Sequence, residues 1–159
     1  MIPSERSYSH VKPLERGAEA PPIPGVEFRN GPVALFFYKV TCPTCQMAAP
    51  LAERLARWHP ERLVGVAQDP PERVEAFARE YRMTFPSVSE VEPYETSNAY
   101  GIRTVPTLFV IEEGRVTEVV ESWDREGWNR LAEHLASTSG TPTETLSTEG
   151  DGLPPFRPG

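Results

Sequence analysis

The stretch VALFFYKVTCPTCQMAAP, residues 33–50, decides the fold of this 159-residue chain. Its first six residues, Val33–Tyr38, form an uninterrupted apolar and aromatic run, which is typical of a β-strand buried on both faces. Helical spacing begins at Pro43 and is carried by Met47, Leu51, Leu55 and Trp58. Because Pro50 falls inside this predicted helix, we expect a kink there. The only two cysteines lie where the strand gives way to the helix.

Outward from this stretch, strands and helices alternate. The apolar patterns predict further strands over 63–67, 87–89, 107–111 and 115–120, and helices over 70–82, 97–100 and 124–136. Glu112-Glu113-Gly114 predicts a hairpin turn, while Asp69 and Asp124 are expected to cap the helices that follow them. This order predicts the α/β fold class, with helices on both faces of a mixed sheet that begins parallel and ends in an antiparallel edge.

The ends of the chain differ in composition from its middle. The 18 prolines gather largely in the first 32 and the last 18 residues, and the final stretch is rich in Ser, Thr and Gly. Such composition is typical of segments without a packed core. We therefore predict an extended N-terminal arm over 1–22, one domain over 23–136 and a disordered C-terminal tail over 137–159.

Charge and hydropathy exclude several classes of protein. The net charge of −7 and the pI near 5.0 argue against nucleic acid or an anionic membrane as a partner. The longest apolar run, Val33–Tyr38, is too short to cross a bilayer. Met1–Gly17 has no apolar core of the kind found in secretory signals, so we expect a cytoplasmic location.

The chemistry is carried by Cys42-Pro43-Thr44-Cys45. Unpaired N–H groups and the positive end of the helix dipole stabilise a thiolate at a helix N-terminus, so Cys42 is the predicted nucleophile. Cys45 lies one turn further and is placed to resolve a mixed disulfide formed at Cys42. A zinc site would need two more ligands, and none of the three histidines is paired at ligand spacing. No metal or organic cofactor is expected.

Three motifs in order resemble the thioredoxin-like superfamily, in its branch of TlpA-type reductases and peroxiredoxin-like redoxins. Residues 42–50 resemble the C-x-x-C helix with its later proline, and residues 64–81 resemble the extra strand–helix insert of that branch. Residues 100–107 resemble the segment that leads into the cis-proline of the superfamily. The resemblance covers roughly two-thirds of the chain, from about Gly31 to Ala136.

This resemblance implies a site and an activity. It implies that Pro106 is cis and faces the two cysteines, and that Val105 offers its backbone to a substrate strand. Pro43 and Thr44 are the other expected substrate-binding residues. The implied activity is thiol–disulfide exchange with a protein disulfide or a small-molecule disulfide, sustained by an electron donor that the sequence does not identify.

The chain also departs from the superfamily. Phe36 occupies the position of the buried carboxylate of thioredoxins, and Thr41 that of the usual tryptophan. We hypothesise that the Lys39 ammonium helps to hold Cys42 as a thiolate; the alternative is that Lys39 only reaches solvent. Two other functions stay open: a peroxiredoxin-like thiol peroxidase, with Cys42 peroxidatic and Cys45 resolving, or a redox-sensing module without turnover. The peroxidase would need a basic partner such as Arg103, but the simpler interpretation is that Arg103 lies on a surface turn before Pro106.

Overall fold

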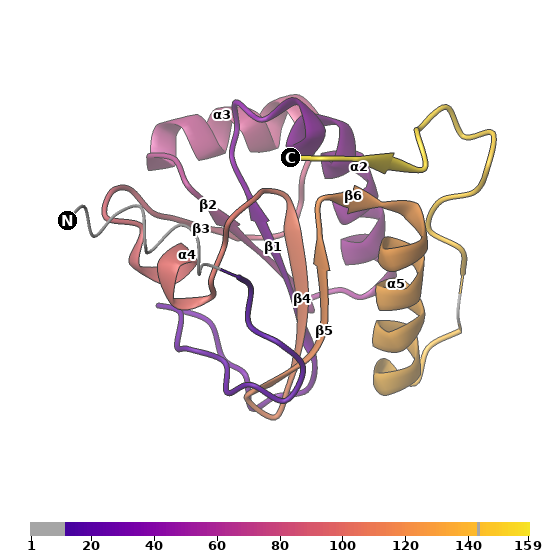
Figure 1. Cartoon of the computed structure of the whole chain (residues 1–159), viewed down its shortest axis with the longest axis horizontal. Helices are drawn as coiled ribbons and strands as arrows, with labels where there is room; N and C mark the ends of the chain where they lie inside the picture. Colours follow the sequence, from indigo (N-terminus) through magenta and orange to yellow (C-terminus); the bar gives the residue numbers. More distant parts are fainter. Residues whose placement is uncertain (1–11, 143) are drawn as a thin grey trace.

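A central five-stranded sheet organises the computed structural model, which describes residues 12–142 and 144–159. Its strands are β1 (Val33–Tyr38), β2 (Leu63–Ala67), β3 (Ser87–Ser89), β4 (Thr107–Glu112) and β5 (Arg115–Glu121), in the spatial order β3-β2-β1-β4-β5. β1, β2 and β3 are parallel, whereas β4 and β5 are antiparallel to their neighbours. The predicted mixed sheet with its antiparallel edge is therefore confirmed (Figure 1).

The helices follow the predicted order. They are α2 (Pro43–Trp58), which contains Pro50, α3 (Pro71–Tyr81), α4 (Glu95–Ala99) and α5 (Arg125–Ser139). α5 ends three residues later than predicted, where Gly140 adopts the left-handed conformation, with φ of 69°, that commonly stops a helix. None of the helices described is long and apolar enough to cross a membrane.

Both faces of β1 are fully buried, which explains its unbroken apolar sequence. One face packs against α2, α3 and α5 through residues that include Phe36, Leu55 and Trp128. The other face is covered by α4 and by the N-terminal arm, where Tyr100 donates a hydrogen bond of 2.6 Å to the carbonyl of Pro21. Helices thus lie on both faces, but of the helices described the short α4 alone lies on the second face, and the arm completes the cover there.

The arm is part of the domain from at least Leu14 onward. Leu14, Ala18 and Ala20 pack on the sheet, and Gly17 N–H donates to the carbonyl of Val116 at 2.8 Å. The predicted domain start at residue 23 is therefore too late. Residues 1–11 of the predicted arm lie outside the described residues.

The C-terminal segment is ordered, so the prediction of a disordered tail is wrong for its described residues. Leu146 is fully buried against α2 and α5, and β7 (Phe156–Arg157) pairs with β6 (Trp123–Asp124) in a second, two-stranded sheet. In Figure 1 this yellow segment leaves α5, returns beside β6 and ends near the start of α2. Its few apolar anchors are too widely spaced to stand out in a composition rich in Ser, Thr, Gly and Pro.

Candidate active site

The sheet register brings the two predicted site segments together. Phe37, near the end of β1, pairs with Thr107, the first residue of the antiparallel β4. The loop before β4 therefore lies beside the turn that follows β1. The Val105–Pro106 peptide bond is cis, which confirms that expectation, and Cys42 Sγ lies 3.5 Å from the carbonyl oxygen of Val105. A second cis bond, Glu92–Pro93, was not predicted.

Cys42 occupies the N-cap position of α2. Its backbone is extended, Pro43 follows as the first helical residue, and the Cys45 N–H donates to Cys42 Sγ at 3.2 Å. A side-chain acceptor bound to the third helical N–H is the usual form of an N-cap, and here the acceptor is sulfur. The helix start therefore fixes the sulfur where the N–H groups of the first turn point at it.

This environment favours the thiolate of Cys42. The hydrogen bond from the Cys45 thiol lowers the pKa of Cys42 to about 6; desolvation opposes it, whereas the N–H groups of Cys45 and Thr44 and the charge of Arg157 assist it. Cys42 is half-buried and Cys45 is fully buried, and both are free thiols. The predicted nucleophile is therefore also the cysteine that ionises first and can be reached.

Burial and the bond to Cys42 raise the pKa of Cys45 above its usual range, and the Asp69 carboxylate adds to this. Asp69 is only 5% exposed and accepts the Val40 N–H at 2.8 Å. The prediction that Asp69 caps α3 is wrong, because Pro70 is the N-cap residue and makes no side-chain capping bond. Instead, Asp69 fastens the end of β2 to the loop that leads into Cys42. Asp124 does hold the N-cap position of α5, but without a side-chain hydrogen bond.

The remaining predicted site residues lie around this loop. The carbonyl of Lys39 accepts the Cys42 N–H at 3.1 Å, and the role of its ammonium stays a prediction. Thr44 is buried, and its hydroxyl donates to the carbonyl of Pro158 at 2.7 Å. Arg103 makes two bonds of 2.8 Å to Glu121, so its guanidinium is engaged at the surface.

An aromatic layer lies in the core below the cysteines. Phe36, at the position of the thioredoxin carboxylate, stacks on Tyr38 at 4.9 Å and meets the edge of Trp128 at 6.1 Å. As predicted from the sequence, no carboxylate stands at this position, and the side chains around Phe36 are aromatic. Among the residues that the structure describes, Asp69 is the carboxylate whose charge contributes to the raised pKa of Cys45.

The C-terminal segment reaches the site, which sequence reasoning missed entirely. The Pro158 carbonyl accepts the hydrogen bond from the Thr44 hydroxyl. The charge of Arg157 lowers the pKa of Cys42, by less than the hydrogen bonds named above. A β-carbon on Gly159 would overlap the carbonyl oxygen of Val105. No sequence signal near residue 157 points to the cysteines, since the two lie more than 100 residues apart.

Solved structures of the same architecture are known. The thioredoxin domain of a thiol-disulfide oxidoreductase from Bacteroides vulgatus superposes with a TM-score of 0.65 at 18% identity, over 77% of this chain and 99% of that one. A thiol:disulfide interchange protein of the thioredoxin family from Chlorobium tepidum gives 0.58 at 20% identity, over 77% and 93%. StoA from Bacillus subtilis gives 0.55 at 26% identity, over 66% and 82%. The thioredoxin-like fold is thereby confirmed.

Sequence comparison gives one family and no individual relative. No curated protein sequence matches the chain significantly. The model of the AhpC/TSA family matches residues 22–119, which include the cysteine pair, the insert over β2 and α3, and the cis-proline. This match spans more than half of the chain and agrees with the fold, so the chain belongs to the AhpC/TSA family.

Proposed function

We propose that the protein is an enzyme, a thiol–disulfide oxidoreductase that passes two electrons from its Cys42/Cys45 dithiol to a disulfide of a partner. The observation that carries this proposal is the opposed character of the two thiols. Cys42 is half-buried with its pKa lowered to about 6, chiefly by the Cys45 thiol, while burial raises the pKa of Cys45. The activity in the names of the similar structures supports the same chemistry.

The first step is attack by the Cys42 thiolate on one sulfur of the substrate disulfide. A bond forms between Cys42 Sγ and that sulfur, the substrate S–S bond breaks, and the other substrate sulfur leaves as a thiolate. The Cys45 N–H, 3.2 Å from Cys42 Sγ, holds the attacking sulfur in place. The Val105 carbonyl beside it, 3.5 Å away, offers a backbone acceptor to an extended substrate.

The second step needs the Cys45 proton to leave. Once Cys42 is in the mixed disulfide it no longer holds a thiolate next to Cys45, and one cause of the raised Cys45 pKa disappears. We assign the proton to Asp69, the buried carboxylate whose charge acts on this thiol. The Cys45 thiolate then attacks Cys42 Sγ, the Cys42–Cys45 disulfide forms and the second substrate thiolate is released.

The cycle closes when an external thiol or dithiol reduces the Cys42–Cys45 disulfide by the same exchange in reverse. The identity of that donor and the direction of net flow depend on the reduction potential of the pair. A cytoplasmic setting, which the sequence leads us to expect, would favour net reduction of the partner.

The test is the thiol–disulfide equilibrium of the pair in glutathione buffers, read by alkylation and mass. A single two-electron transition is expected, and its midpoint sets the direction. The matched variant Cys45→Ser should trap a mixed disulfide at Cys42 with an oxidised protein substrate, whereas Cys42→Ser should trap none. Thiols that stay reduced across the whole range would overturn the proposal, and faster oxidation by hydroperoxide than by protein disulfides would favour the peroxidase alternative.

A further inference from the structure

The last residues of the C-terminal segment contact the two active-site loops that flank Cys42. The Pro158 carbonyl accepts the Thr44 hydroxyl at 2.7 Å, and Gly159 lies so close to the Val105 carbonyl that a β-carbon has no room. Cys42 Sγ is 3.5 Å from that same carbonyl. The segment therefore contacts the residues on both sides of the nucleophile, including the backbone that an extended substrate would use.

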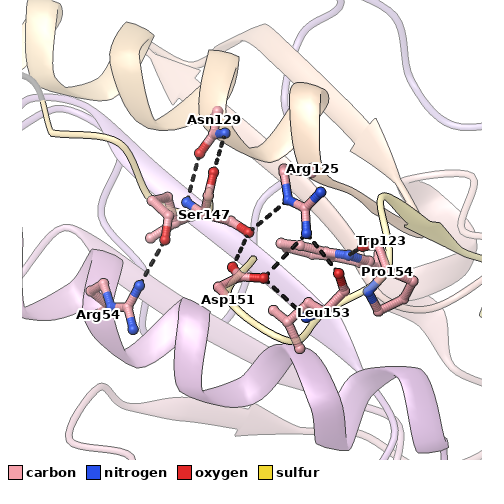
Figure 2. Close-up of polar contacts among 9 residues, drawn as sticks. Arg54, Trp123, Arg125, Asn129, Ser147, Asp151, Leu153 and Pro154 are labelled. Atoms are coloured by element: carbon pink, nitrogen blue, oxygen red, sulfur yellow. Dashed lines mark hydrogen bonds and ion pairs between the residues drawn. The ribbon is translucent and has the colours of Figure 1, made fainter. Parts of the chain in front are cut away.

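The segment is held firmly at a distance from the cysteines (Figure 2). Arg125 donates to Ser147 Oγ at 3.0 Å, to Asp151 at 3.2 Å and to the carbonyl of Leu153 at 2.7 Å. Asn129 exchanges two hydrogen bonds with the backbone of Ser147, at 2.8 and 2.9 Å. Further bonds join Arg54 to the carbonyl of Leu146 and Trp123 to that of Pro154, both at 2.7 Å.

The part nearest the cysteines is held much less. Residues 156–159 are exposed, and Phe156 keeps 56% of its surface open to solvent. Past the short β6–β7 pairing, which ends at Arg157, the segment is joined to the site by the hydrogen bond that Thr44 donates to the Pro158 carbonyl. A segment that is anchored by many hydrogen bonds at one part and by few at another can open locally at the site while it stays attached to the domain.

We propose that residues 156–159 form a displaceable cover over Cys42, which occupies the substrate position between Thr44 and Val105 and has to lift before exchange. This regulation rests on the proposed function of the same site. The cover competes with a substrate strand for the Val105 backbone, so it slows reaction with every partner and excludes those that bind too weakly to displace it.

The test uses the full chain and a reaction that needs no disulfide exchange. Gly159→Leu places a side chain where a β-carbon already overlaps Val105, and Asp151→Ala loosens the anchor far from the cysteines. Glu149→Leu, an exposed position of the same segment, is the matched control. The measurement is the rate constant of Cys42 alkylation by iodoacetamide on the alkaline plateau, where Cys42 is fully thiolate in every variant and the thiolate fraction no longer affects the rate.

Both cover variants should raise the plateau rate constant by about threefold or more, which corresponds to a cover closed at least about two-thirds of the time. The control should react at the rate of the parent chain. The synthetic peptide LPPFRPG, residues 153–159, added to Asp151→Ala should lower the rate again. Parent-like rates in both cover variants would refute the cover.

The two proposals fail separately. Faster alkylation in the cover variants without any exchange with protein disulfides would keep the cover and remove the oxidoreductase. Exchange by the parent chain, with alkylation and exchange unchanged in both cover variants, would keep the oxidoreductase and remove the cover.

Discussion

The ionisation of Cys42 gives the sharpest prediction. Its pKa is lowered to about 6, first by the hydrogen bond from the Cys45 thiol. At pH 7 about 90% of Cys42 is then thiolate, against about 3% of an ordinary cysteine thiol with a pKa near 8.5. A thiolate of lower pKa is also a weaker nucleophile, by roughly tenfold for this difference. The expected advantage over an ordinary thiol is therefore only about twofold to threefold at pH 7.

The advantage grows in acid, because the thiolate fraction of an ordinary thiol falls tenfold per pH unit while that of Cys42 falls little above its own pKa. At pH 5.5 about a quarter of Cys42 is still thiolate, and it should react roughly 20-fold faster than an ordinary thiol. The assay is the initial rate with 5,5′-dithiobis(2-nitrobenzoate) between about pH 5 and 9, with a short cysteine peptide as the reference thiol.

Substitutions can separate the causes of the lowered Cys42 pKa. Cys45→Ser keeps a hydroxyl donor in place of the thiol and should shift the midpoint less than Cys45→Ala, which has none. Arg157→Gln removes the smallest of the assisting causes and should raise the midpoint least. A parent midpoint above about 8, or an unchanged midpoint in Cys45→Ala, would refute the reasoning.

Three further perturbations are predicted. Asp69→Asn should slow the release of the second substrate thiolate by about tenfold to 100-fold at pH 7, so that mixed disulfide accumulates in quenched samples; unchanged release would remove the role of Asp69 as proton acceptor. The pKa of Cys42 is depressed in the fold, so its thiolate stabilises the reduced chain fully above the unfolded pKa near 8.5, and this contribution is lost as pH falls through about 6. The difference in unfolding free energy between the parent and Cys42→Ser should therefore grow from pH 6 to pH 9 in urea titrations, and a flat difference would contradict the shift. Arg125→Ala removes the bonds to Ser147, Asp151 and Leu153 and should lower the unfolding free energy by about 1–3 kcal/mol, whereas the exposed Arg130→Ala on the same helix should change it by less than about 0.5 kcal/mol.

The elements that sequence predicts well are those in which local pattern and burial agree. Val33–Tyr38 is buried on both faces, which is the environment that its unbroken apolar run predicts for a central strand. The hairpin between β4 and β5 was also predicted correctly. Its turn residues Glu113 and Gly114 have φ of 50° and 78°, the positive values that a tight two-residue hairpin turn requires. The cysteine pair was found because its two members are close in sequence as well as in space.

The parts that escaped prediction depend on contacts between distant segments. The C-terminal segment is held by side chains of α2 and α5, such as Arg54 and Arg125, whose sequence spacing also suits an ordinary exposed helix face. Asp69 precedes a helix and has the residue type of a cap, yet the competing N–H of Val40 lies in the loop after β1, which is distant in sequence. The composition of a segment does not show whether it is ordered, because that depends on the contacts that distant parts of the chain make with it.

The N-terminal arm has a consequence for how the protein behaves at high concentration. β5 is the last strand of its sheet, and an uncovered last strand offers its N–H and C=O groups to any other extended chain. Val116 donates to the Ala18 carbonyl at 2.9 Å and accepts from Gly17 at 2.8 Å, while Ala20 donates to Gly114 at 2.8 Å. The arm thus uses up the pairing capacity at the start of β5 and protects the molecule from strand-to-strand self-association, a safeguard that a chain shortened to residue 23 would lose.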